Sequence, residues 1–161
     1  MSIFITGEIG INHNGDVKIA KDLILGAKKS GANAVKFQKR TLELVYTQEQ
    51  LESFRDSPWG KTFKDQKKEI ELDEKDFFEI DSYCKEIKID WYVSCWDVES
   101  QKLMRKFNCK YNKVASAMLA HDDLIKEIAK EKKHTFISTG MHSIDEIKKV
   151  VEVFKKLNCP F

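Results

Sequence analysis

Five short apolar segments of this sequence each run directly into polar residues, and each is followed by a stretch with helical periodicity. Strands that alternate with helices indicate right-handed crossovers and a parallel sheet covered by helices. The expected strands are residues 3–9, 34–38, 90–95, 111–115 and 134–138, and the expected helices are residues 16–30, 73–87, 98–107, 121–131 and 143–157.

Two α/β architectures fit this pattern, an open doubly wound sheet and a (β/α)₈ barrel. The first turn, Gly7-Glu8-Ile9-Gly10, lacks the glycine spacing of a dinucleotide-binding fold. Polar residues at the ends of the strands favour the barrel, whose active sites lie at the carboxyl ends of its strands. We therefore expect a partial TIM (β/α)₈ barrel of about five βα units.

A complete barrel usually takes about 250 residues, whereas this chain has 161. We expect the chain to stop before strand six, which residues 159–161 approach, and to leave two unpaired sheet edges that favour association. All of 1–161 is assigned to one barrel domain. Residues 39–72, with Pro58 and Gly60, form an expected insertion with one or two short helices.

The charge balance excludes some classes of partner. The 28 basic residues nearly cancel 26 acidic ones, leaving +2, and the two signs are interspersed, so neither nucleic acid nor an anionic membrane is an expected partner. No apolar stretch approaches the roughly 20 residues of a membrane span, and we expect a cytoplasmic protein. The cysteines lack metal-ligand spacing, which predicts reduced structural thiols and no metal site in this chain.

The Glu8 carboxylate is the first candidate for chemistry, because an acid in an apolar strand must be desolvated, paired or used. Burial would raise its pKa toward a general acid or base role. The alternative is a structural partner for a nearby lysine. Asn12 and Asn14, next to Gly15, either contact a ligand or build a tight turn.

Basic and hydroxyl side chains follow the other strands. Lys36 and Gln38 share one side of their strand, and the opposite, helix-covered side would be buried, so we expect both to face a ligand. Lys113 and Ser116 repeat the pattern on the fourth strand, and Ser138 follows the fifth. Two ammonium groups and several hydroxyls around one mouth suggest a doubly anionic substrate such as a phosphorylated carboxylic acid.

Several of these segments together resemble the N-acetylneuraminate (sialic acid) synthase family. The resemblance covers nearly the whole chain and the N-terminal half of the family's polypeptide. It is carried by the segments Glu8-Ile9-Gly10-Ile11-Asn12-His13-Asn14-Gly15, Ala34-Val35-Lys36-Phe37-Gln38, Tyr46-Thr47, Ser57-Pro58-Trp59-Gly60, Lys113-Val114-Ala115-Ser116 and Ile137-Ser138-Thr139-Gly140-Met141.

The resemblance implies a barrel that condenses phosphoenolpyruvate with N-acetylmannosamine and water to give N-acetylneuraminate and phosphate. It implies a divalent metal, Mn²⁺ or Mg²⁺, that polarises the sugar aldehyde. The metal-binding histidines of the family and a C-terminal domain that completes a homodimer would lie beyond Phe161. We therefore expect no complete active site, and no turnover, from this chain alone.

The resemblance also implies roles for individual residues of this sequence, at the positions that match the family's motifs. Glu8 matches the acid that acts on a sugar hydroxyl or the attacking water, Lys36 the lysine on the phosphoenolpyruvate carboxylate, and Gln38 a neighbour that reaches the sugar. The phosphate-binding positions match Lys113, Ser116 and Ser138. Cys95 stands where the family has a threonine, which weakens one hydrogen bond to the carboxylate, and Ala117-Met118 replaces the Gly-Glu common in the family.

Other functions stay open. The same chemistry could serve a legionaminic or pseudaminic acid synthase, with a related 2-acetamido sugar as acceptor. A 3-deoxy sugar acid synthase is a more distant alternative, which the Asn12-His13-Asn14-Gly15 turn disfavours. A non-catalytic module that retains the anion pocket, or a fragment with no function of its own, belongs to a different class.

Overall fold

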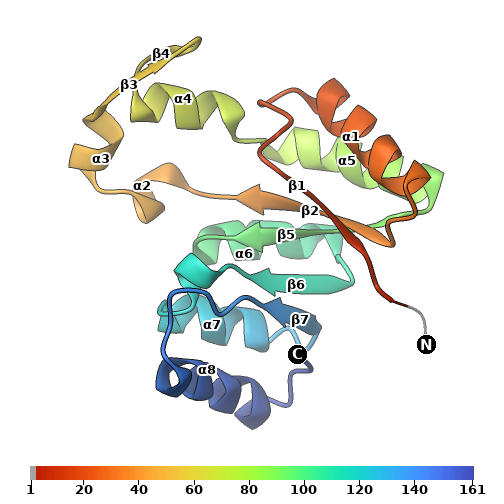
Figure 1. Ribbon diagram of the computed structural model, residues 1–161, viewed down its shortest axis with the longest axis vertical. Coiled ribbons are helices and arrows are strands. Elements are labelled where there is room, and N and C mark those ends of the chain that lie inside the picture. The colour runs from red at the N-terminus through yellow and green to blue at the C-terminus, as the bar shows by residue number, and fades with distance from the viewer. Residues whose placement is uncertain (1–2) are drawn as a thin grey trace.

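The computed structural model describes residues 3–161 and contains a five-stranded parallel sheet in the order β1-β2-β5-β6-β7 (Figure 1). Neighbours in the sheet follow one another along the chain, apart from a two-stranded β3-β4 hairpin outside it. A doubly wound sheet would reverse its order at a switch point. The sheet strands are β1 Thr6–Gly10, β2 Ala34–Lys39, β5 Asp90–Cys95, β6 Tyr111–Val114 and β7 His134–Ile137.

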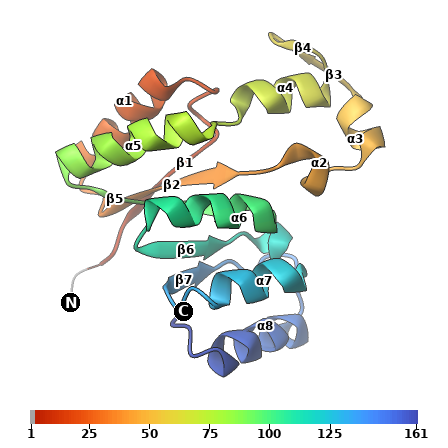
Figure 2. The same ribbon diagram turned by 180° about the vertical axis from the view of Figure 1, so that it is seen from behind.

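Helices cover one face of this sheet. Figure 2 shows α5, α6 and α7 in front of the strands, whereas the opposite view in Figure 1 shows the strands in front. These helices confirm the predicted segments to within a few residues at their ends. They are α1 Val17–Lys29, α5 Glu74–Ile87, α6 Val98–Met104, α7 Asp122–Ala129 and α8 Ile144–Lys156, with 3₁₀ turns η1 Arg105–Phe107 and η2 Ser116–Met118. Within residues 3–161, none of the helices combines the length and apolarity that crossing a membrane requires.

The first strand begins three residues later than predicted. Thr6 pairs with Ala34, the first residue of β2, so the preceding residues have no strand beside them. The backbone of Ile5 instead accepts a hydrogen bond from the N–H of Asn33, at 2.8 Å. The apolar run therefore extends past the end of its pairing partner, and Ile3, Phe4 and Ile5 are exposed.

The insertion after β2 holds more structure than predicted. It contains three helices and a hairpin, whereas one or two short helices were expected, and capping boxes at Thr47 and at Thr62 start two of these helices. Tyr46, which follows α2, packs edge-on against Phe63 at the start of α4, with the ring centroids 5.0 Å apart. Its elements are α2 Leu42–Val45, α3 Gln48–Glu52, β3 Phe54–Ser57, β4 Gly60–Thr62 and α4 Phe63–Ile70.

Alternation along the strands separates the apolar core from the polar face. In β2, Val35 and Phe37 are buried in the core on the helix side, where Phe37 meets Phe77 of α5 at 6.3 Å. Each such side chain contributes about 1.5–3 kcal/mol by burial. The intervening Lys36 and Gln38 must therefore face the other side of the sheet.

On the face of the sheet without helices, the side chains change from aromatic to polar along each strand. Tyr92, Tyr111 and Phe136 pack together there, with ring centroids 5.6–5.8 Å apart. Two residues further on, the same strands carry Ser94, Lys113 and the segment leading to Ser138. An aromatic layer therefore underlies a polar layer at the carboxyl ends of the strands.

The turn after β1 depends on Gly15. Its φ is +79°, and a Cβ there would overlap the carbonyl oxygen of Glu69 at the end of α4. We expect Gly15→Ala to lower the free energy of unfolding by about 2–3 kcal/mol, from backbone strain and overpacking. Urea denaturation of both proteins measures the difference.

Gly26 is the matched control, because it lies inside α1 and an added Cβ meets nothing within 4 Å. Gly26→Ala is expected to raise the free energy of unfolding by about 0.5–1 kcal/mol. Equal effects of the two substitutions would contradict the contact between the first turn and α4.

Candidate active site

An ion pair joins the carboxyl ends of β1 and β2. Glu8 and Lys36 are register partners, and Glu8 Oε1 lies 2.9 Å from Lys36 Nζ. The Lys36 side chain is 6% exposed and that of Glu8 is 57% exposed. The Glu8 carboxylate is therefore paired and not desolvated, because β1 is an edge strand and leaves it uncovered. Whether this pair also has a catalytic role stays a prediction.

Lys113 extends from β6 toward the same region as the Glu8–Lys36 pair, and the region around these three residues is called the mouth from here on. It is half-buried, and its Nζ contacts the Oγ of Ser138 at the end of β7. Burial lowers the pKa of Lys113, the Lys36 ammonium lowers it further, and the Glu8 carboxylate raises it. Glu8, Lys36 and Lys113 therefore share one electrostatic environment, with one more positive than negative charge among them.

Hydroxyl groups surround the Lys113 side of the mouth. The Ser138 N–H donates to the Val114 carbonyl at 3.0 Å, which holds the end of β7 beside β6. Ser116 begins η2, and its Oγ would lie 3.8 Å from a Cβ at Gly140. The strand ends that carry Lys113, Ser116 and Ser138 are thus adjacent, as predicted.

Gln38 lies next to the Glu8–Lys36 pair. A Cβ at Gly10 would come within 3.5 Å of Gln38 Nε2 and 3.1 Å of Glu8 Oε1, so both groups flank that glycine. The Gln38 Oε1 accepts a hydrogen bond from Arg40. Arg40 was missed by the sequence reading, although its position two residues after Gln38 places it on the same side of the chain.

The turn Asn12-His13-Asn14-Gly15 owes its shape to the histidine. His13 is buried, and its Nδ1 accepts the Gly15 N–H at 3.0 Å. Burial lowers the pKa of His13, while the Gly10 backbone raises it. Asn12 and Asn14 are exposed, and Asn14 adopts a left-handed φ of +51°. This geometry supports a structural role for the segment, in which it forms a tight turn. Contacts between the two asparagines and a ligand stay a prediction.

Cys95 is not brought to the mouth. It follows Trp91 and Val93 into the core on the helix side, and burial raises the pKa of its thiol well above the ordinary value. The expectation of substrate contact by the Cys95 side chain is therefore corrected, because the alternation of β5 places it on the other face. Ser94 instead pairs in register with Gln38 and with Lys113.

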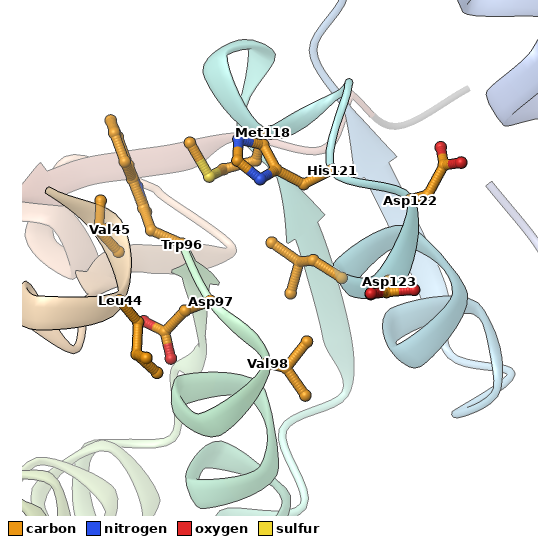
Figure 3. Close-up of a pocket in the computed structure, with 10 residues that line it drawn as sticks. Leu44, Val45, Trp96, Asp97, Val98, Met118, His121, Asp122 and Asp123 are labelled. Atoms are coloured by element: carbon orange, nitrogen blue, oxygen red, sulfur yellow. The ribbon is translucent and has the colours of Figure 1, made fainter. Parts of the chain in front are cut away.

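A cavity of about 400 Å³ lies beside this region, between α2, the β5–α6 connection and the start of α7 (Figure 3). None of the predicted site residues lines it. The lining carboxylate of Asp97 already accepts hydrogen bonds from the Thr41 and Ser100 N–H groups, both at 2.7 Å. The ammonium groups of Lys36 and Lys113 therefore lie outside this cavity, whose charged lining includes the acidic residues Asp97, Asp122 and Asp123.

The mouth does not fit a divalent cation, because the Lys36 ammonium already pairs with Glu8 and the Lys113 ammonium adds a second positive charge to the same region. Within residues 3–161, no three His, Cys, Asp or Glu side chains lie close enough to hold a metal ion together. What the arrangement suits is an anion with two negatively charged ends, each of which meets an ammonium group.

Comparisons with known proteins show which family this chain resembles over most of its length. A sequence profile of the NeuB family matches residues 23–160. The N-acetylneuraminate-9-phosphate synthase of Mus musculus is 36% identical over 160 residues, covering 98% of this chain and 45% of the mouse protein. The N,N'-diacetyllegionaminic acid synthase of Legionella pneumophila is 30% identical over 158 residues, covering 96% of this chain and 44% of that protein. The chain spans less than half the length of these curated relatives.

A solved structure shares the fold over the whole chain. It is the N-acetylneuraminic acid (sialic acid) synthetase from Leptospira borgpetersenii, in complex with citrate. Its TM-score is 0.87 at 25% identity, over 100% of this chain and 53% of the other.

Charge coupling across the mouth gives a direct prediction. We expect Lys36→Met to raise the pKa of Lys113, because it removes a neighbouring ammonium, and Glu8→Gln to lower it, because it removes the compensating carboxylate. The ¹³Cε shift of Lys113 in an NMR pH titration measures both. If the pKa of Lys113 is the same in both variants as in the wild type, the three groups do not share one electrostatic environment.

The same shift makes stability depend on pH. The pKa of Lys113 is lowered from 10.5 in the folded state, so the unfolded chain binds more protons between the lowered value and 10.5. We expect the free energy of unfolding, relative to Lys113→Met, to rise with pH across that window. Urea denaturation of the two proteins at a series of pH values measures it, and a difference that falls with pH contradicts the assignment.

Proposed function

The chain belongs to the NeuB family, and we propose that it provides the phosphoenolpyruvate site of a synthase that joins phosphoenolpyruvate to a 2-acetamido sugar. With N-acetylmannosamine as acceptor, the products are N-acetylneuraminate and phosphate. The observation that carries the proposal is that Lys36 and Lys113, from separate strands of one sheet, approach the same region, with Lys36 paired to Glu8 and Lys113 in contact with Ser138.

The two ends of phosphoenolpyruvate match the two ends of the mouth. Lys36 takes the carboxylate, and Lys113 takes the phosphate together with the hydroxyls of Ser116 and Ser138. The contact between Lys113 and Ser138 supports this division, because it already places an ammonium and a hydroxyl side by side. The named Leptospira relative was solved with citrate, another organic polyanion.

In the proposed reaction, C3 of the enol attacks the aldehyde carbon of the open-chain sugar and forms the new C–C bond. Water adds to C2, and the C2–O bond to phosphate breaks. The lysines neutralise the charge that collects on the departing phosphate. An incoming carboxylate competes with Glu8 for Lys36, which frees the Glu8 carboxylate to accept a proton from the water or a sugar hydroxyl.

The acceptor sugar is the open part of this proposal. The names of the relatives point to products of the N-acetylneuraminate-9-phosphate and the diacetyllegionaminic acid type. Assays of the whole protein with N-acetylmannosamine, its 6-phosphate and a 2,4-diacetamido sugar compare these acceptors directly. The sugar with the highest kcat/KM identifies the class.

The remaining parts of the proposal follow the family. For the whole protein we propose a homodimer and a divalent metal, Mn²⁺ or Mg²⁺, which would be held by residues other than those of this mouth and would supply Lewis-acid activation of the aldehyde. A cytoplasmic setting is supported by four buried free cysteines, which suit a reducing compartment. The 161-residue chain is expected to bind phosphoenolpyruvate without turning it over.

Calorimetry with phosphoenolpyruvate tests the proposal. We expect Lys36→Met and Lys113→Met each to weaken binding about 10-fold to 100-fold, because each removes a charge-assisted contact. Lys148→Met is the matched control, since Lys148 is an exposed lysine on α8 paired only with Asp145 in i,i+3 spacing among the described residues.

The outcomes separate the candidate functions. Absence of phosphoenolpyruvate binding by a folded wild-type sample overturns the proposed site. Binding by the whole protein without turnover of any of the sugars leaves the non-catalytic anion-binding module. Equal losses in all three variants would assign the effect to net charge and not to this mouth.

A further inference from the structure

Arg40 is a buried arginine directly beyond the strand that carries Lys36 and Gln38. Its side chain is 4% exposed, and Nη1 lies 2.5 Å from Oε1 of Glu71, which is 9% exposed. Its guanidinium also stacks on the Trp96 ring, 4.6 Å from the centroid. The Glu71 Oε2 accepts the Arg40 backbone N–H at 3.1 Å. Arg40 is therefore held from several directions and cannot swing freely.

The remaining contact of this guanidinium is with the proposed site, because Nη2 donates to the Gln38 side chain. A guanidinium can only donate hydrogen bonds, so the Gln38 atom facing Arg40 must be the amide oxygen. The amide nitrogen then faces away from Arg40. It lies beside Gly10, where Glu8 Oε1 also lies.

The unpaired atoms of this cluster point to a functional role. Among residues 3–161, the buried Nε of Arg40 has no hydrogen-bond partner, and neither does the neighbouring buried Oγ of Ser94. A buried arginine kept only for stability would be expected to satisfy its donors. Incomplete satisfaction next to a charged mouth is more typical of a site arranged around a ligand.

We propose that Arg40 is a positioning residue that fixes the Gln38 amide so that Nε2 presents its N–H groups to an oxygen of the acceptor sugar. This inference rests on the proposed function. Binding is favoured for an acceptor sugar with a carbonyl or hydroxyl oxygen opposite Gln38 Nε2. A sugar with a group there that can only donate a hydrogen bond is disfavoured, because two donors would face each other. The insertion contributes through Glu71, which follows α4 and orients the guanidinium.

Arg40→Lys is the sharpest test, because it keeps a cation opposite Glu71 but loses the forked donor to Gln38. We expect KM for the acceptor sugar to rise about 10-fold or more in the whole protein, with KM for phosphoenolpyruvate nearly unchanged. In a Gln38→Ala background, Arg40→Lys should add little further effect, because the two residues act as one unit.

Lys39→Met is the matched control, since Lys39 also approaches Glu71, at 3.7 Å, but donates to the Leu72 carbonyl instead of to Gln38. It should leave both KM values near wild type. A second variant, Arg40→Met with Glu71→Gln, removes both buried charges and avoids an unpaired carboxylate. It should lose acceptor affinity while remaining folded.

A second readout does not depend on turnover. In ¹⁵N NMR spectra of the ligand-free chain, the Gln38 side-chain NH₂ signals should shift and average in Arg40→Lys and stay in place in Lys39→Met. Unchanged NH₂ signals, an unchanged acceptor KM, or an undiminished effect in the Gln38→Ala background would each overturn the proposal. Absence of synthase activity in the wild type defeats the proposed function instead, and the NH₂ signals still decide the role of Arg40.

Discussion

The ion pair between Glu8 and Lys36 is the interaction on which the rest of the site depends. Lys36 is almost wholly buried, and a buried ammonium without a partner would be costly. Its neighbours Val35 and Phe37 are committed to the helix-side core, so Lys36 has no route to that face. The parallel pairing of β1 with β2 brings the Glu8 carboxylate beside it. Sheet pairing, and not a loop, therefore sets the position of the first charges at the mouth.

Lys113 completes the mouth because the order of strands is sequential. With β5 between β2 and β6, Ser94 links Gln38 and Lys113 in register across adjacent strands. The aromatic layer of Tyr92, Tyr111 and Phe136 lies beneath these groups on the same face of the sheet. The result is a positively charged rim on an apolar base, which suits a compact dianion.

The sequence alone predicted the parts of the site that follow strand periodicity. Lys36 lies between the apolar Val35 and Phe37, so its face followed directly from the pattern, and Gln38, two residues later, shares that face. The exposure of Glu8 did not follow from the pattern, because alternation along one strand does not reveal which strand forms the sheet edge. Cys95 was assigned to the site by its match to a family motif, although the alternation of β5 puts it on the same face as Val93, in the core. Arg40 was missed because its partners, Glu71 and Trp96, are distant along the chain and meet only through the insertion.

The central claim is that Lys36 and Lys113 bind the two ends of one dianion. A crystal structure of the protein with phosphoenolpyruvate tests it most directly. The account predicts the carboxylate within hydrogen-bond distance of Lys36 Nζ, and the phosphate on Lys113 Nζ and Ser138 Oγ. A phosphoenolpyruvate molecule seated instead in the cavity beside Trp96, with both lysines free of it, would contradict the account.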